Sequence, residues 1–195
     1  MIVSELPRTV DVCGRSHAVR WDMCAALDIL CALADPDLTD REKVYITLSI
    51  FYVDGIPTDT TEAYRRAVWF LDGGTAPDGD APHGPRVMDW EQDWPLIIAP
   101  VNRVLGYDVR GVSHETHWWT FLSAFQEIGD CTFAHVVRIR DHRARGKKLD
   151  KSDREFARRN ARIVNLKTKY TQGEQELIAS IVKASQQKEG GGADG

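Results

Sequence analysis

The sequence lacks the motifs that mark the common catalytic and cofactor sites. It contains no GxxxxGK[ST] phosphate-binding loop, no GxGxxG turn following a strand and no GxSxG nucleophile elbow. Carboxylate pairs occur along the chain, but no pattern assigns any pair to a cleft. We therefore expect a protein that is not an enzyme, with no catalytic residues and no cofactor.

Long apolar runs are also absent, since no stretch approaches the ~18 uncharged apolar residues of a membrane span. The first residues, MIVSELPRTV, contain Glu5 and Pro7 rather than a basic, apolar leader. The four cysteines have no paired spacing, which is typical of reduced thiols in a cytosolic protein (Cys13, Cys24, Cys31, Cys131). These features favour a cytoplasmic protein without a membrane partner.

Metal-binding patterns are scarce. His114-Glu115-Thr116-His117 is one residue shorter than the HExxH zinc motif, so its histidines stand at i and i+3 rather than at i and i+4. Asp78-Gly79-Asp80 lacks the further ligands of a calcium loop. We expect no metal site, with His114 and His117 at the start of a helix.

Acidic and basic residues are unevenly distributed. The net charge is −4, yet residues 138–169 hold 13 Lys/Arg against 4 Asp/Glu, a local charge of +9. The rest of the chain therefore carries −13 (−4 minus +9), and residues 54–93 alone hold 9 acids against 3 bases. Such polarity bears on association rather than on the fold.

Hydrophobic periodicity predicts a mainly α fold, with a small N-terminal β-hairpin followed by about seven or eight helices. The hairpin pairs residues 9–12 with 17–20 around a four-residue turn, 13–16. Capping boxes at Thr39, Ser152 and Thr171 predict three helix starts, the second of them for a helix reaching Tyr170. The other helices are expected near 22–34, 59–72, 89–106, 117–128 and 132–145.

A Gly/Pro-rich linker, residues 73–88, divides the chain. It separates an acidic part, 1–72, from a Trp-rich and basic part, 89–187, and residues 188–195 form a disordered tail. The two parts are either two domains or one core with a long insertion.

An aromatic cluster within 36 residues offers candidate partner-binding residues, namely Trp90, Trp94, Trp118, Trp119, Phe121 and Phe125. Trp118 and Trp119 point about 100° apart on a helix, so one narrow core seam does not hold both. Either the helix is buried on two sides, or some of these rings line a groove for another chain, where large aromatics are favoured anchors.

The basic stretch has three interpretations: a solvated helix face, a contact between copies of the chain, or a phosphate-binding surface. Its candidate electrostatic contacts are Arg138, Arg140, Arg143, Lys147, Lys148, Arg158, Arg159 and Arg162. The acidic net charge and the lack of a recognised nucleic-acid module make nucleic-acid binding the least favoured of the three.

Several segments together resemble a tail-module family of long-tailed phages and prophages of Gram-positive bacteria. They include Trp94-Pro95-Leu96-Ile97, Val104-Leu105-Gly106, Ile128-Gly129-Asp130 and, most specifically, the His-Trp-Trp-x-Phe motif of residues 117–121. Members are usually encoded just before the tape-measure protein. The resemblance implies a non-enzymatic tail assembly chaperone that binds the tape-measure protein, helps recruit tail-tube protein and self-associates.

Two other functions remain open. One is a structural tail or head-completion component that stays in the virion. The other is a nucleic-acid-binding phage regulator that uses residues 138–169.

Overall fold

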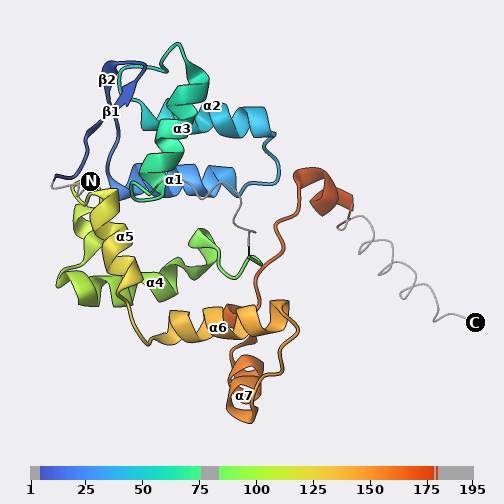
Figure 1. The fold of residues 1–195 in the computed structure, drawn as a ribbon. Helices are drawn as coiled ribbons and strands as arrows, with labels where there is room; N and C mark the ends of the chain where they lie inside the picture. The colour runs from blue at the N-terminus through green and yellow to red at the C-terminus, as the bar shows by residue number, and fades with distance from the viewer. Residues whose placement is uncertain (1–4, 76–83, 178, 180–195) are drawn as a thin grey trace, which may run out of the picture.

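A computed structural model describes residues 5–75, 84–177 and 179 (Figure 1). This part of the chain is mainly helical with one two-stranded hairpin, as the periodicity predicts. In order, the elements are β1 (Thr9–Val12), β2 (Arg15–Ala18), α1 (Met23–Leu33), α2 (Asp40–Phe51), α3 (Thr60–Leu71), α4 (Trp90–Leu105), the 3-10 helix η1 (Val109–Val112), α5 (Trp118–Gln126), α6 (Thr132–Ala144), α7 (Lys151–Arg159) and α8 (Ala161–Val164). Residues 172–177 are also helical.

The hairpin has a tighter turn than predicted. Val12 pairs with Arg15, so only Cys13 and Gly14 form the turn, and the prediction of a four-residue turn is wrong. Both turn residues have positive φ, 51° and 79°, as the two-residue turn that matches strand twist requires. Val10 and Val12 point into the core, which places the hairpin against α3.

Each of the first three helices begins with a side-chain cap, and only that of α2 is predicted from the sequence. Asp22 and Asp59 each accept backbone N–H bonds at the starts of α1 and α3. Thr39 and Glu42 form the predicted capping box of α2 in both directions. Each cap satisfies donors that a helix N-terminus otherwise leaves unpaired.

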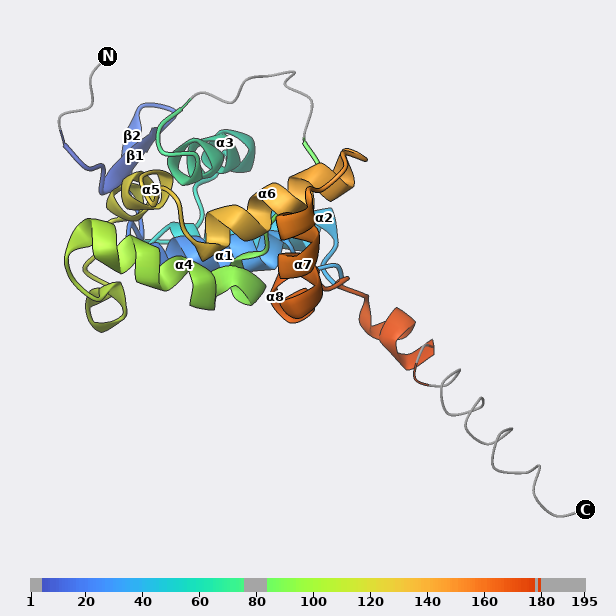
Figure 2. The same cartoon turned by 90° about the horizontal axis from the view of Figure 1, so that it is seen from below.

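One hydrophobic core contains residues from both sides of the Gly/Pro-rich segment, including Met23, Phe70, Ile97 and Trp118. Helix α1 contacts α2, α4 and α5, so α1 joins the N-terminal helices to the C-terminal ones. Seen from below, the hairpin lies toward one end of the body and α7 and α8 toward the other (Figure 2). Half of the predicted linker, residues 76–83, lies outside the described residues, and residues 84–88 contain no helix or strand.

The prediction of one helix from Ser152 to Tyr170 is wrong. Asp150, not the predicted Ser152, caps α7, which ends at Arg159, and after α8 the chain is extended over residues 165–170. The carbonyl groups of Ile163 and Val164 accept hydrogen bonds from the buried guanidinium of Arg140 instead of continuing a helical ladder. The third predicted capping box, Thr171 with Glu174, is present. The predicted tail, 188–195, lies outside the described residues.

Candidate functional site

A surface groove of about 580 Å³ lies between α4, α5 and the end of α3. We call it the Trp119 groove. Its lining is Leu6, Asp72, Gly73, Thr75, Val104, Leu105, Trp119, Thr120, Leu122, Ser123, Ala124, Gln126 and Glu127. Its size is that of an ordinary binding pocket, about 300–1,000 Å³.

Trp119 is fixed in the wall of this groove. Its indole N–H donates to the carbonyl of Phe70 at 2.8 Å, and its ring meets that of Trp69 edge-on with centroids 5.4 Å apart. Only 9% of the residue is exposed. The neighbouring indole, Trp118, donates to the carbonyl of Leu71 at 2.8 Å. Two adjacent tryptophans thus donate to consecutive carbonyls at the end of α3, of which that of Phe70 also accepts the Gly73 N–H.

Gly74 allows the chain to leave α3 past Trp119. A Cβ atom at this position would lie 2.6 Å from Cη2 of Trp119, and the φ of Gly74 is +82°. Both the close approach and the left-handed backbone require glycine. The Gly73-Gly74 pair, which begins the predicted linker, is therefore also part of how Trp119 is placed.

Apolar side chains are exposed along the groove, and acids lie among its lining residues. Leu6 is 49% and Val104 41% exposed, although both are large and hydrophobic. Asp72 and Glu127 supply negative charge. Burial raises the pKa of the Asp72 carboxyl. The groove therefore offers apolar contact together with local negative charge.

Most of the predicted aromatic candidates lie elsewhere. Trp118 and Phe121 are 1% and 0% exposed, so they belong to the core and not to a partner surface. Trp90, Trp94 and Phe125 are partly buried and pack against that core. The Trp90 ring lies 5.2 Å from Phe125, and Trp94 stacks on Phe121 at 5.9 Å. The helix is buried on two sides, which was the first interpretation of the cluster, and of the six candidates only Trp119 lines the groove.

His117 of the His-Trp-Trp-x-Phe motif has a structural role. Its Nδ1 accepts the backbone N–H of Trp119 at 3.0 Å, which makes His117 the N-cap of α5. Its Nε2 lies 2.9 Å from the carbonyl oxygen of Pro7 and therefore carries the proton in the neutral ring. Burial lowers the pKa of His117, aided by the nearby positive charge of Arg8.

The basic candidates divide into one buried residue and an exposed set. Arg140 is 5% exposed and bonded to Asp93, so its prediction as a surface contact is wrong. The others are exposed, and we call them the basic face: Arg138, Arg143, Lys147, Lys148, Arg158, Arg159 and Arg162. They lie on or beside α6, α7 and α8, the end of the body away from the hairpin (Figure 1).

The acidic and basic segments partly neutralise each other within one chain. Nζ of Lys169 lies 2.6 Å from the Glu91 carboxylate and 3.3 Å from that of Asp89. Arg140 likewise pairs with Asp93, which belongs to the acidic segment. Less unpaired charge is therefore available for contacts between copies than the net charges of residues 54–93 and 138–169 indicate.

The fold and the groove define a mainly helical protein with an apolar surface groove and a separate basic face. No helix among the described residues is long and apolar enough to cross a membrane. The chain belongs to the family described as Bacteriophage Gp15 protein, whose profile matches residues 2–166. No curated protein and no solved structure matches the chain. The match confirms a bacteriophage family and spans both predicted parts; the tail module stays a prediction.

Proposed function

We propose that this phage protein is a non-enzymatic tail assembly chaperone, acting in the host cytoplasm, that binds an apolar helical segment of the tape-measure protein. The observation that carries the proposal is the Trp119 groove, with exposed Leu6 and Val104, on a chain of a bacteriophage family. An amphipathic helix places apolar side chains at i, i+3 and i+4, which suits a short groove between helices.

The small size of the Trp119 groove predicts modest affinity of each copy of the protein for the client. It admits a few apolar side chains, so one copy of the protein holds only a short stretch of a long client. Several copies along one client, each with weak contacts, provide avidity and still permit replacement by tail-tube protein. The negative charge of Asp72 and Glu127 favours basic residues beside the apolar ones on the client.

Co-expression with the tape-measure protein tests this proposal, with Val104→Glu as the diagnostic variant. Val104 is 41% exposed in the groove, whereas Val53, outside it, is 50% exposed and gives the matched control Val53→Glu. We expect soluble tape-measure protein with the native chain and with Val53→Glu, but not with Val104→Glu. Tape-measure protein that is no more soluble with the native chain than without it contradicts the proposal.

The basic face supports a second candidate, a nucleic-acid-binding regulator. Its arginines on α7 and α8 are exposed, so phosphate contacts are sterically available. This function predicts salt-sensitive binding whose salt slope falls in the triple variant Arg158→Ala, Arg159→Ala, Arg162→Ala. The same face could instead contact acidic residues of a second copy, which sedimentation of the same variant at low and high salt would detect.

A structural tail or head-completion component would remain in the virion. Mass spectrometry of purified particles tests this alternative.

A further inference from the structure

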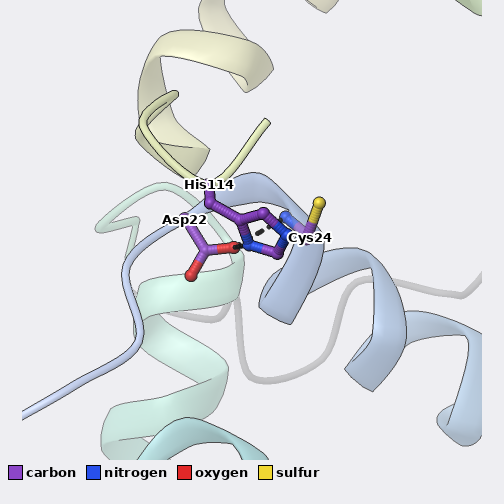
Figure 3. Close-up of side chains that lie close together, drawn as sticks. All are labelled: Asp22, Cys24 and His114. Carbon is purple, nitrogen blue, oxygen red and sulfur yellow. Dashed lines mark hydrogen bonds and ion pairs between the residues drawn. The ribbon is translucent and has the colours of Figure 1, made fainter. Parts of the chain in front are cut away.

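Three metal-ligating side chains converge at the start of α1. Asp22, Cys24 and His114 each offer one ligand atom, and these atoms lie within 4.8 Å of one another (Figure 3). Nδ1 of His114 is 3.5 Å from Oδ1 of Asp22. Asp22 and Cys24 are partly buried, whereas His114 is exposed on the segment that leads into α5.

The backbone that carries these side chains is already fixed. The N–H of Met23 donates to the carbonyl of Thr116 at 3.0 Å, and that of Trp118 to the carbonyl of Trp21 at 2.8 Å. Asp22 pairs with His117 in an antiparallel bridge between these two bonds. The two segments are therefore joined before any ion binds, so a ligand set assembled there costs little loop ordering.

The Asp22 carboxylate is held in place by the backbone, and the oxygen that faces His114 is Oδ1 (Figure 3). Its Oδ1 accepts the backbone N–H groups of Cys24 and Ala25, both at 3.1 Å. In the part of the chain that the structure describes, no hydrogen bond reaches its Oδ2. A carboxylate held in this way resembles the oriented ligands of metal sites, which need a supporting hydrogen bond.

We propose that Asp22, Cys24 and His114 bind a zinc ion through one oxygen, one sulfur and one nitrogen. Thiolate and imidazole donors suit Zn²⁺, whereas Ca²⁺ and Mg²⁺ prefer oxygen ligands alone. Ligand atoms about 2.0–2.3 Å from tetrahedral zinc, only one of them sulfur, are about 3.3–3.6 Å apart, so atoms now within 4.8 Å of one another close by about 1.5 Å at most. The Cys24 thiol proton is released to solvent on binding, and water takes the fourth position on the exposed side of His114.

Bound zinc would tie α1 to the segment just before the His-Trp-Trp-x-Phe motif. Sequence spacing does not indicate such a site, because His114 lies 90 residues from Cys24, while the conspicuous pair, His114 and His117, has the wrong spacing. His117 is occupied by its cap and by Pro7. The inference concerns residues outside the Trp119 groove and does not depend on the chaperone proposal.

Metal titration of the chelator-treated, reduced protein tests the site. Zn²⁺ is followed by calorimetry and Co²⁺ by absorption, since cobalt bound to a thiolate gives a charge-transfer band. We expect one equivalent bound, a thiolate band, and about tenfold or greater weakening in each of Cys24→Ser, His114→Gln and Asp22→Asn. Asp22→Asn retains an oxygen that can cap α1, and His114→Gln changes an exposed side chain, so both variants should fold.

Two matched controls should bind like the native protein. Cys31→Ser alters the other half-buried cysteine of α1, and Glu115→Gln alters the exposed neighbour of His114. If folded protein gives no thiolate band with Co²⁺, the proposed site is wrong. Equal weakening by Cys31→Ser and Cys24→Ser overturns it as well.

Discussion

The guanidinium of Arg140 on α6 forms a two-pronged ion pair with the carboxylate of Asp93 on α4, with Nη1 2.6 Å from Oδ2 and Nη2 2.9 Å from Oδ1. Both side chains are almost fully buried, at 4% and 1% exposure. Arg140 also donates to the carbonyls of Val87, Ile163 and Val164. One side chain thus connects α4, α6, α8 and the segment that precedes α4.

Arg140→Met should cost about 3–5 kcal/mol of the free energy of unfolding, because it leaves the Asp93 carboxylate buried without its partner. The double variant Arg140→Met, Asp93→Leu should recover part of that loss, since no charge is then left unpaired. Urea denaturation measures both. Arg145→Ala removes the exposed pair with Asp141 and should change stability by at most about 1 kcal/mol. If Arg140→Met loses as little free energy of unfolding as Arg145→Ala, the Arg140–Asp93 pair does not stabilise the fold.

Gly74→Ala should destabilise the protein more than Gly106→Ala. Both glycines have left-handed φ, +82° and +79°, so each alanine incurs about 1–2 kcal/mol of backbone strain. Only at Gly74 does the new Cβ meet another side chain, the ring of Trp119, and overpacking adds about 1–3 kcal/mol. Denaturation midpoints compare the two variants, and near-ultraviolet circular dichroism reports the tryptophan environment. Equal losses would mean that Trp119 moves aside freely.

The features predicted correctly from sequence are those encoded locally. Thr39 and Glu42 stand three residues apart, so their capping box is readable without knowledge of the rest of the chain. The end of α8 is different, because the carbonyls of Val164 and Ile163 accept hydrogen bonds from Arg140, which lies 24 and 23 residues earlier in the chain. Periodicity alone continues the helix across that point.

The placement of the tryptophans also depends on distant partners. Trp118 and Trp119 donate to carbonyls 47 and 49 residues away, at the end of α3. A sequence pattern shows that both rings need burial but not which surfaces supply it. The groove was missed for the same reason: Leu6, Val104 and Leu122 come from three separate segments, and each alone is an ordinary apolar residue.

His117 should make stability depend on pH. Burial lowers its pKa in the native state below the unfolded value of about 6.5, so the unfolded chain binds the proton more readily. The stability that neutral His117 contributes is therefore present above pH ~6.5 and is lost as the pH falls through that value toward the native pKa. Protonated Nδ1 would also face the Trp119 N–H, donor against donor, which removes the cap.

Urea midpoints between about pH 7.5 and 5.5 measure this effect against His117→Asn. Asparagine caps a helix without titrating in this range, so the variant should lose less stability on acidification than the native protein. The remaining histidines are common to both proteins and cancel in the comparison. Identical pH slopes would exclude His117 as the titrating group.

Gln92 should control access to the extended C-terminal segment. Its Nε2 donates to the Asn165 carbonyl at 2.8 Å, and its Oε1 accepts the Lys167 N–H at 2.9 Å. Gln92→Ala removes both bonds, which together contribute about 1–2 kcal/mol at an exposed site. Local opening that exposes Lys167 and Lys169 to trypsin should then rise about 5- to 30-fold.

Gln126→Ala, an exposed glutamine on α5, is the matched control and should be cleaved at the native rate. Mass spectrometry of the early fragments locates the cut. The free energy of unfolding of Gln92→Ala should fall by at most the same ~1–2 kcal/mol, and that of Gln126→Ala should hardly change. Early cuts confined to Lys167 and Lys169 in Gln92→Ala therefore separate release of the segment from global unfolding, which would expose lysines and arginines throughout the chain. Equal cleavage of both variants would show that Lys169, through Glu91 and Asp89, holds the segment without Gln92.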